Sequence, residues 1–123
     1  FADWERTYRG LLDQARQANP ALKIVLCTPF AAPCGKIVEG ALGEYYPLRQ
    51  RILAQCCVIV ERNAADYGAT LVPFHRLIAD LETRLPNGDA TYWVWDGIHP
   101  TPAGQRLMAD CWIGAAARNG VME

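Results

Sequence analysis

Hydrophobic residues recur along the chain at two different spacings, and these spacings predict its helices and strands. Residues 3–18 carry apolar side chains three and four positions apart, as one face of an amphipathic helix requires, with Asp3 as the expected N-cap. Residues 22–27 form a short, almost continuous apolar run that is typical of a strand buried on both faces. Residues 28–43 contain several prolines and glycines and are expected to form a loop with at most a short turn of helix. Such a loop could edge a substrate cleft or simply connect two elements.

The second half of the chain predicts three more helices and one more strand. A long helix is expected over residues 44–67, a strand over 69–73 and a helix over 74–85, followed by a turn cluster at 86–89 and a last helix at 101–118. The long helix should pack on a sheet through Tyr45, Leu48, Ile52, Cys56 and Ile59, with Leu53, Val60 and Ala64 beside them, and stop at Gly68. The last helix should bury Leu107, Met108, Cys111, Trp112 and Ala115.

The predicted order of elements is helix, strand, helix, strand, helix, loop, helix. Strands that alternate with helices indicate an α/β fold with parallel pairing and right-handed crossovers. Two strands do not make a stable sheet alone, because a sheet needs more strands or extra packing. The pattern therefore predicts that further strands come from the rest of the domain or from a partner.

Composition limits the classes of function. The chain has 123 residues, of which 51% are hydrophobic and 20% charged, as in an ordinary globular protein, although an α/β hydrolase domain usually needs nearer ~200 residues. A net charge of −1 argues against a surface for nucleic acid or anionic membranes. The apolar runs are short, so no membrane span is predicted. Phe1 leads directly into a helix pattern without signal-peptide organisation, and any targeting segment would lie upstream.

The cysteine pattern favours free thiols. The five cysteines are odd in number and form no C-x-x-C pair, and Cys27, Cys56 and Cys111 fall in apolar patterns. Free thiols favour a cytoplasmic setting, and localisation is otherwise undetermined; a Cys27–Cys34 disulfide is the alternative. No metal is expected, because zinc-ligand spacings are absent and a site built from Cys34, Cys56, Cys57 and His75 is not favoured.

The stretch from residue 93 to residue 102 carries the clearest chemical pattern. Asp96 precedes His99 by three residues, as a local carboxylate–imidazole pair would require. In hydrolytic triads the carboxylate holds one ring N–H of the histidine, and the other ring nitrogen takes the proton of the nucleophile. Gly97 permits a tight turn between the two, and Pro100 keeps His99 extended and outside a helix. Thr101 and Pro102 are expected as N-cap and first residue of the last helix.

These residues resemble a known family. Asp96-Gly97-Ile98-His99-Pro100-Thr101, followed by Ala103-Gly104 and an amphipathic helix, resembles the last sequence block of the SGNH (GDSL-type) serine hydrolases. The strand at 23–28 ending in Pro29, with a long helix after it, is similar to the later half of that fold. The resemblance implies a flavodoxin-like three-layer α/β/α fold, of which residues 1–123 are the C-terminal half of a single domain. It also implies an esterase or acylhydrolase in which Asp96 orients His99 as general base, without a cofactor.

The chain departs from the family in one important respect. It contains no serine, and the blocks that carry the family's nucleophile and oxyanion-hole glycine and asparagine are absent. The nucleophile is therefore expected on a missing N-terminal segment or another chain, and this chain alone should be inactive. The substrate would be an ester, for example of an acetylated carbohydrate or a lipid-like acyl group. The alternative is a non-catalytic, truncated α/β module that packs against a partner chain.

Candidate substrate-binding residues follow from position. Thr28 and Phe30 come after the first strand, at the end where open α/β sheets bind ligands. Trp95 precedes the predicted pair, and with Tyr92 and Trp93 it could form an acyl- or sugar-binding wall or anchor the loop to the core. Cys34 is the candidate for an alternative cysteine nucleophile. His75, at the start of a helix, could line a site, although a capping or surface role is favoured.

Overall fold

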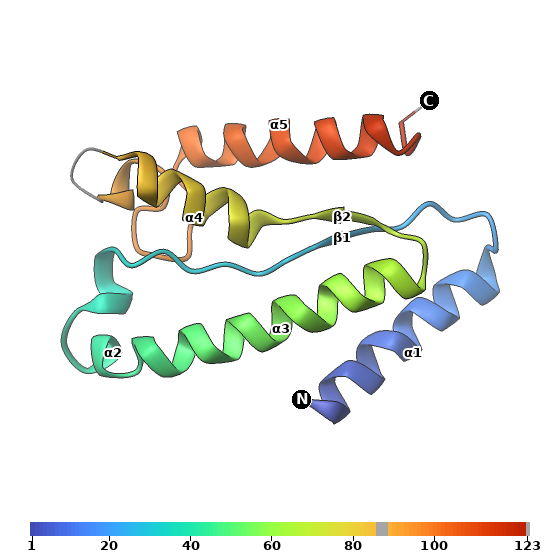
Figure 1. Ribbon diagram of the computed structural model, residues 1–123, viewed down its shortest axis with the longest axis horizontal. Helices are drawn as coiled ribbons and strands as arrows, with labels where there is room; N and C mark the ends of the chain where they lie inside the picture. Colours follow the sequence, from blue (N-terminus) through green and yellow to red (C-terminus); the bar gives the residue numbers. More distant parts are fainter. Residues whose placement is uncertain (86–88, 123) are drawn as a thin grey trace.

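A two-stranded parallel sheet lies between helices in the computed structural model, which describes residues 1–85 and 89–122 (Figure 1). Strand β1 (Val25–Cys27) pairs with β2 (Thr70–Val72), and Leu26 lies opposite Leu71. The α-helices are α1 (Ala2–Ala18), α2 (Gly40–Glu44), α3 (Tyr46–Asp66), α4 (Phe74–Arg84) and α5 (Pro102–Arg118), and the 3-10 helices are η1 (Gly35–Val38) and η2 (Ala90–Tyr92).

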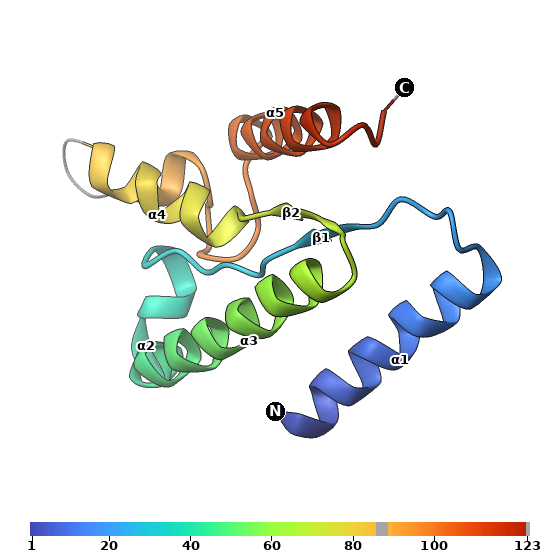
Figure 2. The same ribbon diagram turned by 45° about the vertical axis from the view of Figure 1, so that its right-hand side comes forward.

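Helices cover both faces of the sheet. Figures 1 and 2 place α3 and α1 on one side of the strands, and α5 on the other with α4 beside it. Helix α3 packs on both strands and α5 packs on β2. The α/β, three-layer prediction is therefore confirmed, and the long crossover from β1 to β2 through α3 explains why the strands are parallel. The layers are incomplete, because the sheet has two strands in the part of the chain that the structure describes.

The predicted order of elements is confirmed, with corrected boundaries. The first strand begins at Val25 instead of residue 22, because Leu22 donates its N–H to the Asn19 carbonyl in a turn. The chain from Cys34 onward contains η1 and α2, and the predicted long helix is interrupted at Tyr45. Asp3 is not the N-cap of α1; it lies in the first turn and pairs with Arg6. Of the predicted turn cluster at 86–89, residues 86–88 lie outside the described residues.

The buried faces of two helices differ from the prediction. In α3, Ile59, Val60 and Ala64 are buried as predicted, and Cys57 and Asn63 are buried beside them. The predicted Tyr45, which precedes α3, and Leu48 and Ile52 are exposed instead, while Leu53 and Cys56 are half-buried. Nearly every residue from 52 to 60 is apolar, so spacing alone could not select the face. In α5 only Gly104, Ala115 and Ala116 are buried, and the predicted Leu107, Met108, Cys111 and Trp112 are half-buried.

Two apolar clusters form the core. The sheet cluster consists of Leu12, Leu26, Val60 and Ala64, which join α1, β1 and α3. The loop cluster consists of Ala32, Cys34, Ile78, Ala90 and Val94, with Phe30, Leu81, Leu85 and Trp93 packed against it. The loop cluster joins the chain after β1 to α4 and to the segment before α5, so it lies under the region that contains the predicted acid–base pair.

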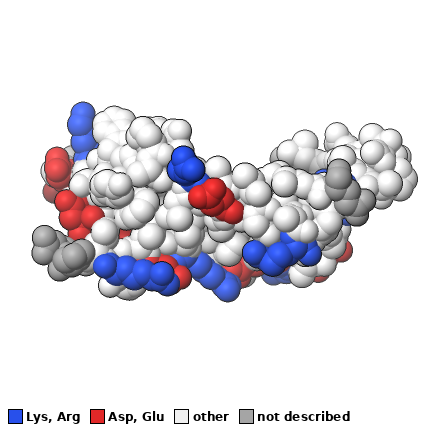
Figure 3. All heavy atoms as spheres, turned by 90° about the horizontal axis from the view of Figure 1, so that it is seen from above, with Lys and Arg blue, Asp and Glu red and all other residues white. Residues whose placement is uncertain are grey.

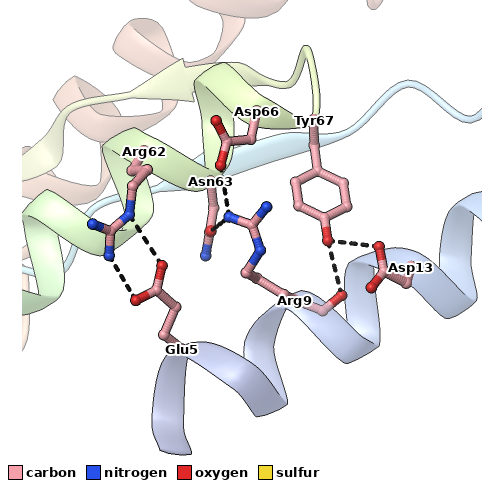
Figure 4. Close-up of polar contacts among 7 residues, drawn as sticks. All are labelled: Glu5, Arg9, Asp13, Arg62, Asn63, Asp66 and Tyr67. Carbon is pink, nitrogen blue, oxygen red and sulfur yellow. Dashed lines mark hydrogen bonds and ion pairs between the residues drawn. The ribbon is translucent and has the colours of Figure 1, made fainter. Parts of the chain in front are cut away.

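Polar contacts attach α1 to the C-terminal half of α3 (Figure 4). Arg9 donates to Asn63 Oδ1 (3.0 Å) and to Asp66 Oδ2 (2.7 Å), and its guanidinium lies over the Tyr67 ring. Tyr67 in turn donates its hydroxyl toward Asp13. A bidentate pair between Arg62 and Glu5 completes the group. These contacts fix α1 beside α3 although much of the apolar surface of α1 is exposed.

The surface carries charge of both signs. Figure 3 shows Lys and Arg mainly along one edge, with acidic side chains near them, and most of this face is uncharged. Among the described residues no helix is both long and apolar enough to cross a membrane.

Candidate active site

The segment between η2 and α5 forms a short hairpin-like loop that presents the predicted pair. Val94 and Pro100 make an antiparallel bridge, and Trp95 N–H donates to the His99 carbonyl (3.2 Å). Thr101 N–H donates to the Trp93 carbonyl (2.9 Å) at the base of the loop. The loop therefore closes on itself by backbone hydrogen bonds and turns at residues 96–98.

Asp96 and His99 form the carboxylate–imidazole pair that the sequence predicts. Asp96 Oδ2 lies 2.6 Å from His99 Nδ1, and Oδ1 accepts the backbone N–H groups of His99 (2.8 Å) and Ile98 (3.1 Å). Gly97 has φ +92°, a left-handed conformation that glycine adopts without strain, and this allows the return of the chain within three residues. All three hydrogen bonds of the carboxylate are thus made within its own turn.

The hydrogen bonds of the pair keep Asp96 ionised and select the tautomer of the His99 ring. The hydrogen bond from His99, with smaller help from the two backbone donors, lowers the pKa of Asp96 from 3.8 to about 2. An ionised carboxylate only accepts hydrogen bonds, so the proton of the neutral imidazole lies on Nδ1 and Nε2 is free to accept one. The His99 side chain is 67% exposed and that of Asp96 is 15% exposed. This arrangement can carry out general acid–base catalysis at Nε2.

The start of α5 holds the other end of the loop. Thr101 is the N-cap, as predicted: its hydroxyl accepts the Gly104 N–H (3.1 Å) and donates to the Tyr92 carbonyl (2.7 Å). Pro102 is the first helical residue. Gly104 lies so close to the chain that a Cβ there would be 2.1 Å from the Trp93 carbonyl oxygen. Helix and loop therefore have a fixed relative position.

The three aromatic residues before the pair have different environments. Trp93 packs against the loop cluster, as the anchoring alternative predicted. Trp95 is 57% exposed, and its ring centroid lies 6.1 Å from that of His99. Tyr92 is exposed and contacts Trp93 edge-on. Of the three, Trp95 is therefore the aromatic side chain that lies beside the imidazole, and it is the one that the sequence offered as a substrate-binding residue.

Thr28 has a structural partner that the sequence did not reveal. It is 2% exposed, its hydroxyl oxygen accepts the backbone N–H of His75 (3.2 Å), and it lies 2.8 Å from His75 Nδ1. The N-cap of α4 is Pro73, which makes no side-chain cap, so Thr28 satisfies a first-turn N–H of α4 from another element. Thr28, and not His75, therefore caps the first turn of α4, so the favoured capping role of the His75 side chain is not observed, and the Thr28 hydroxyl is committed to His75.

Phe30 separates two hollows on the surface. One is a groove of about 580 Å³ between α1 and the end of β1, lined by Trp4, Thr7, Tyr8, Leu11, Cys27, Thr28, Pro29, Phe30 and Val60. The other is a cavity of about 280 Å³ between α3 and α4, whose polar lining includes Tyr46, Gln50, His75 and Glu82. Burial raises the pKa of Glu82. The structure therefore places Thr28 and Phe30 together on the groove, and Trp95, Asp96 and His99 together on the loop.

The cysteine alternatives are not supported. All five cysteines are free, so the alternative of a Cys27–Cys34 disulfide is wrong. Cys34 is 5% exposed and its thiol donates to the Val94 carbonyl (2.8 Å). Burial raises the pKa of Cys34, which disfavours a reactive thiolate. No group of three or more His, Cys, Asp or Glu side chains suited to a metal ion occurs within residues 1–85 and 89–122.

Comparisons with known proteins identify the family and the fold. The profile of the GDSL-like lipase/acylhydrolase family matches residues 1–107. A solved structure from Parabacteroides merdae, described as a "putative GDSL-like lipase", is similar with a TM-score of 0.76 and 28% identity. The similarity covers 92% of this chain and 48% of that one, so the chain spans about half of the length of that protein. No curated protein matches.

Proposed function

The chain belongs to the GDSL-like lipase/acylhydrolase family, and on this premise we propose that it supplies the acid–base half of an ester hydrolase. The observation that carries the proposal is the 2.6 Å contact between Asp96 Oδ2 and His99 Nδ1 on an exposed loop. Because the chain has no serine, the proposed nucleophile is a serine outside residues 1–123. These residues are then the C-terminal half of a single hydrolase domain.

The proposed mechanism follows from the free Nε2 of His99. As the serine oxygen attacks the ester carbonyl, its proton moves to Nε2, and the Asp96 carboxylate stabilises the imidazolium that forms. The tetrahedral intermediate collapses when the same proton passes to the departing alcohol oxygen, which leaves an acyl-serine. Water then attacks the acyl carbonyl, gives its proton to Nε2 and releases the acid, while the proton returns to serine.

The proposed substrate is a small-molecule or carbohydrate ester whose acyl or sugar part lies against Trp95. The support is the exposure of this indole and its position beside the His99 ring. A flat aromatic surface next to the general base can bind either an acyl chain or a sugar face. Phe30, on the groove beside the end of β1, is the second candidate contact.

The proposed partner is the N-terminal half of the same domain, placed along the free edge of β1. Strand β1 pairs only with β2 in the described sheet, so its other edge can accept a further parallel strand. The groove of about 580 Å³ lies beside that edge. Exposed apolar side chains on or next to α1 (Phe1, Trp4 and Leu11) would be covered by such a partner. The same docking would bring a serine toward His99.

The test uses the complete protein that contains this chain and measures hydrolysis of p-nitrophenyl acetate. We expect His99→Ala to abolish turnover and Asp96→Asn to reduce kcat by about 10³–10⁴-fold through the wrong tautomer. His75→Gln, at the other histidine, is the matched control and should retain activity. Wild-type turnover in His99→Ala would exclude this histidine as the base.

A second measurement separates the hydrolase from the non-catalytic module. A fluorophosphonate probe followed by peptide mass spectrometry should label a serine outside residues 1–123, and labelling should fall in His99→Ala. A non-catalytic module would leave every serine of the protein and its associated chains unlabelled. That result, with a folded protein, would contradict the proposed function.

A further inference from the structure

The segment of residues 32–35 lies directly against the back of the Asp96 turn. Ala32 N–H donates to the Gly97 carbonyl (2.9 Å), although the two are more than 60 residues apart in the sequence. A Cβ built at Gly35 would lie 2.5 Å from Asp96 Cα and 2.8 Å from the Trp95 carbonyl oxygen. These distances are shorter than atoms tolerate, so the two backbones can approach this closely only because residue 35 has no side chain.

The same segment is fixed by the loop cluster. Ala32 and Val94 are fully buried and Cys34 is 5% exposed. The Cys34 thiol donates to the Val94 carbonyl at 2.8 Å, two residues before Asp96. A Cβ built at Gly97 would lie 2.4 Å from the Ile37 side chain and 2.6 Å from the Cys34 carbonyl oxygen. Where the backbone of the turn faces residues 32–37, it thus contacts close-packed neighbours that cannot shift without opening a cavity.

The carboxylate has no comparable support of its own. The hydrogen bonds of Asp96 go to Ile98 and His99, which belong to the same turn. The orientation of the carboxylate therefore depends on the backbone of the turn, and the backbone depends on residues 32–35. We propose that Cys34 and Gly35 are positioning residues that hold Asp96 and His99 in the geometry of a general base, an inference that rests on the function proposed above.

The geometry leaves little tolerance for movement. The contact between Asp96 Oδ2 and His99 Nδ1 is 2.6 Å, and a shift of about 1 Å would take it past the usual range of hydrogen bonds. The neutral imidazole of His99 would then lose its preference for the Nδ1–H tautomer, and Nε2 would carry the proton in part of the molecules. A base in that tautomer cannot accept a proton at Nε2.

The experiment measures ring tautomers directly by long-range ¹H–¹⁵N correlation of the histidine side chains at about pH 8.5, with ¹⁵N shifts that separate protonated from unprotonated ring nitrogens. The spectrum is recorded on the complete protein that contains this chain, and the two histidines of residues 1–123 are identified by the signals that His99→Ala and His75→Gln remove. In the wild type, His99 should show Nδ1–H. His75 should show Nε2–H, because its Nδ1 faces the Thr28 hydroxyl and its Nε2 faces Glu61. His75 is therefore an internal reference for an intact fold.

The decisive comparison is Gly35→Ala against Gly68→Ala. Both glycines have nearly the same positive φ (+62° and +59°), so both variants carry the same backbone strain, but a Cβ at Gly68 meets nothing within 4 Å. We expect Gly35→Ala to lose the Nδ1–H preference of His99, while Gly68→Ala and the His75 signals stay as in the wild type. An unchanged His99 tautomer in a folded Gly35→Ala protein would overturn the proposal.

A second pair of variants, both at Cys34, tests the positioning role if Gly35→Ala does not fold. Cys34→Ala removes the donor to Val94, whereas Cys34→Ser retains one. Loss of the Nδ1–H preference of His99 in Cys34→Ala, with recovery in Cys34→Ser, would support the positioning role, and an unchanged tautomer in Cys34→Ala would exclude it. Failure of the proposed function is distinguishable, because it would appear as absent turnover in a wild-type protein whose His99 tautomer still responds to these substitutions.

Discussion

The hydroxyl of Thr28 gives a direct test of how β1 is joined to α4. The perturbation is Thr28→Val, which keeps the branched shape and removes the hydroxyl alone. Two contacts with His75 are lost, one to its backbone N–H at 3.2 Å and one to its Nδ1 at 2.8 Å. Because Thr28 is 2% exposed, water cannot easily take the place of the missing oxygen. We therefore expect a measurable decrease in the free energy of unfolding.

The magnitude follows from the two contacts separately. The backbone N–H lies in the first turn of α4, so its loss should cost about 1 kcal/mol, as for an N-cap. The ring contact contributes less than a fully buried hydrogen bond, because the His75 side chain is 29% exposed and water can reach it; about 0.5 kcal/mol is reasonable. The expected total is about 1–2 kcal/mol, or a shift of about 1 M in the urea midpoint.

The assay is urea denaturation followed by far-UV circular dichroism, with Thr70→Val as the matched control. Thr70 is also buried, at 7% exposure, but its hydroxyl makes no hydrogen bond within the described residues, and valine favours strands. We expect the control to lie within about 0.5 kcal/mol of the wild type. An equal effect of the two substitutions would refute the reasoning, because the Thr28 hydroxyl would then contribute nothing specific.

Three further outcomes are expected. Gly104→Ala should lower the free energy of unfolding by about 1–3 kcal/mol, because its Cβ would meet the Trp93 carbonyl. Gly10→Ala, whose Cβ would meet open space, should stabilise α1 by about 0.5–1 kcal/mol in the same denaturation assay. Thr101→Ala removes the cap of α5 and should cost about 1 kcal/mol, read from the melting temperature. The pKa of His75 is lowered from 6.5, mainly by burial, so the unfolded chain binds more protons than the folded one. The free energy of unfolding should therefore fall as the pH decreases through and below 6.5. His75→Gln should reduce that pH dependence in denaturation measured from pH 8 to 5.

The sequence predicted those features whose partners are local. The Asp96–His99 pair, its turn at Gly97 and the cap at Thr101 depend on residues within a few positions of one another. Their types and spacing therefore contain the geometry. The order of helices and strands was predictable for the same reason, because hydrophobic spacing is a local property of each element.

Features that depend on distant partners were not predictable. Thr28 acts on a helix that begins 46 residues later, and nothing in either segment indicates this contact. The contact of Gly35 with Asp96 depends on how the segment after β1 packs against the loop that precedes α5. For α3, the buried face depended on which of many apolar residues met the sheet, and only packing decides that. A loop glycine next to Cys34 was visible in the sequence, but its role was not.

The difference in sequence separation between the two supports of the turn has a consequence for folding kinetics. The hydrogen bonds between Asp96 and His99 close a turn of four residues and can form on the timescale of local loop closure. The hydrogen bond from Ala32 to Gly97 closes a loop of about 65 residues and must wait for β1, α3 and β2 to assemble. During refolding, the imidazole should therefore meet its carboxylate early and become immobilised late. Trp95, exposed beside the imidazole, is an intrinsic fluorophore placed to report the late step, in which residues 32–35 contact the turn.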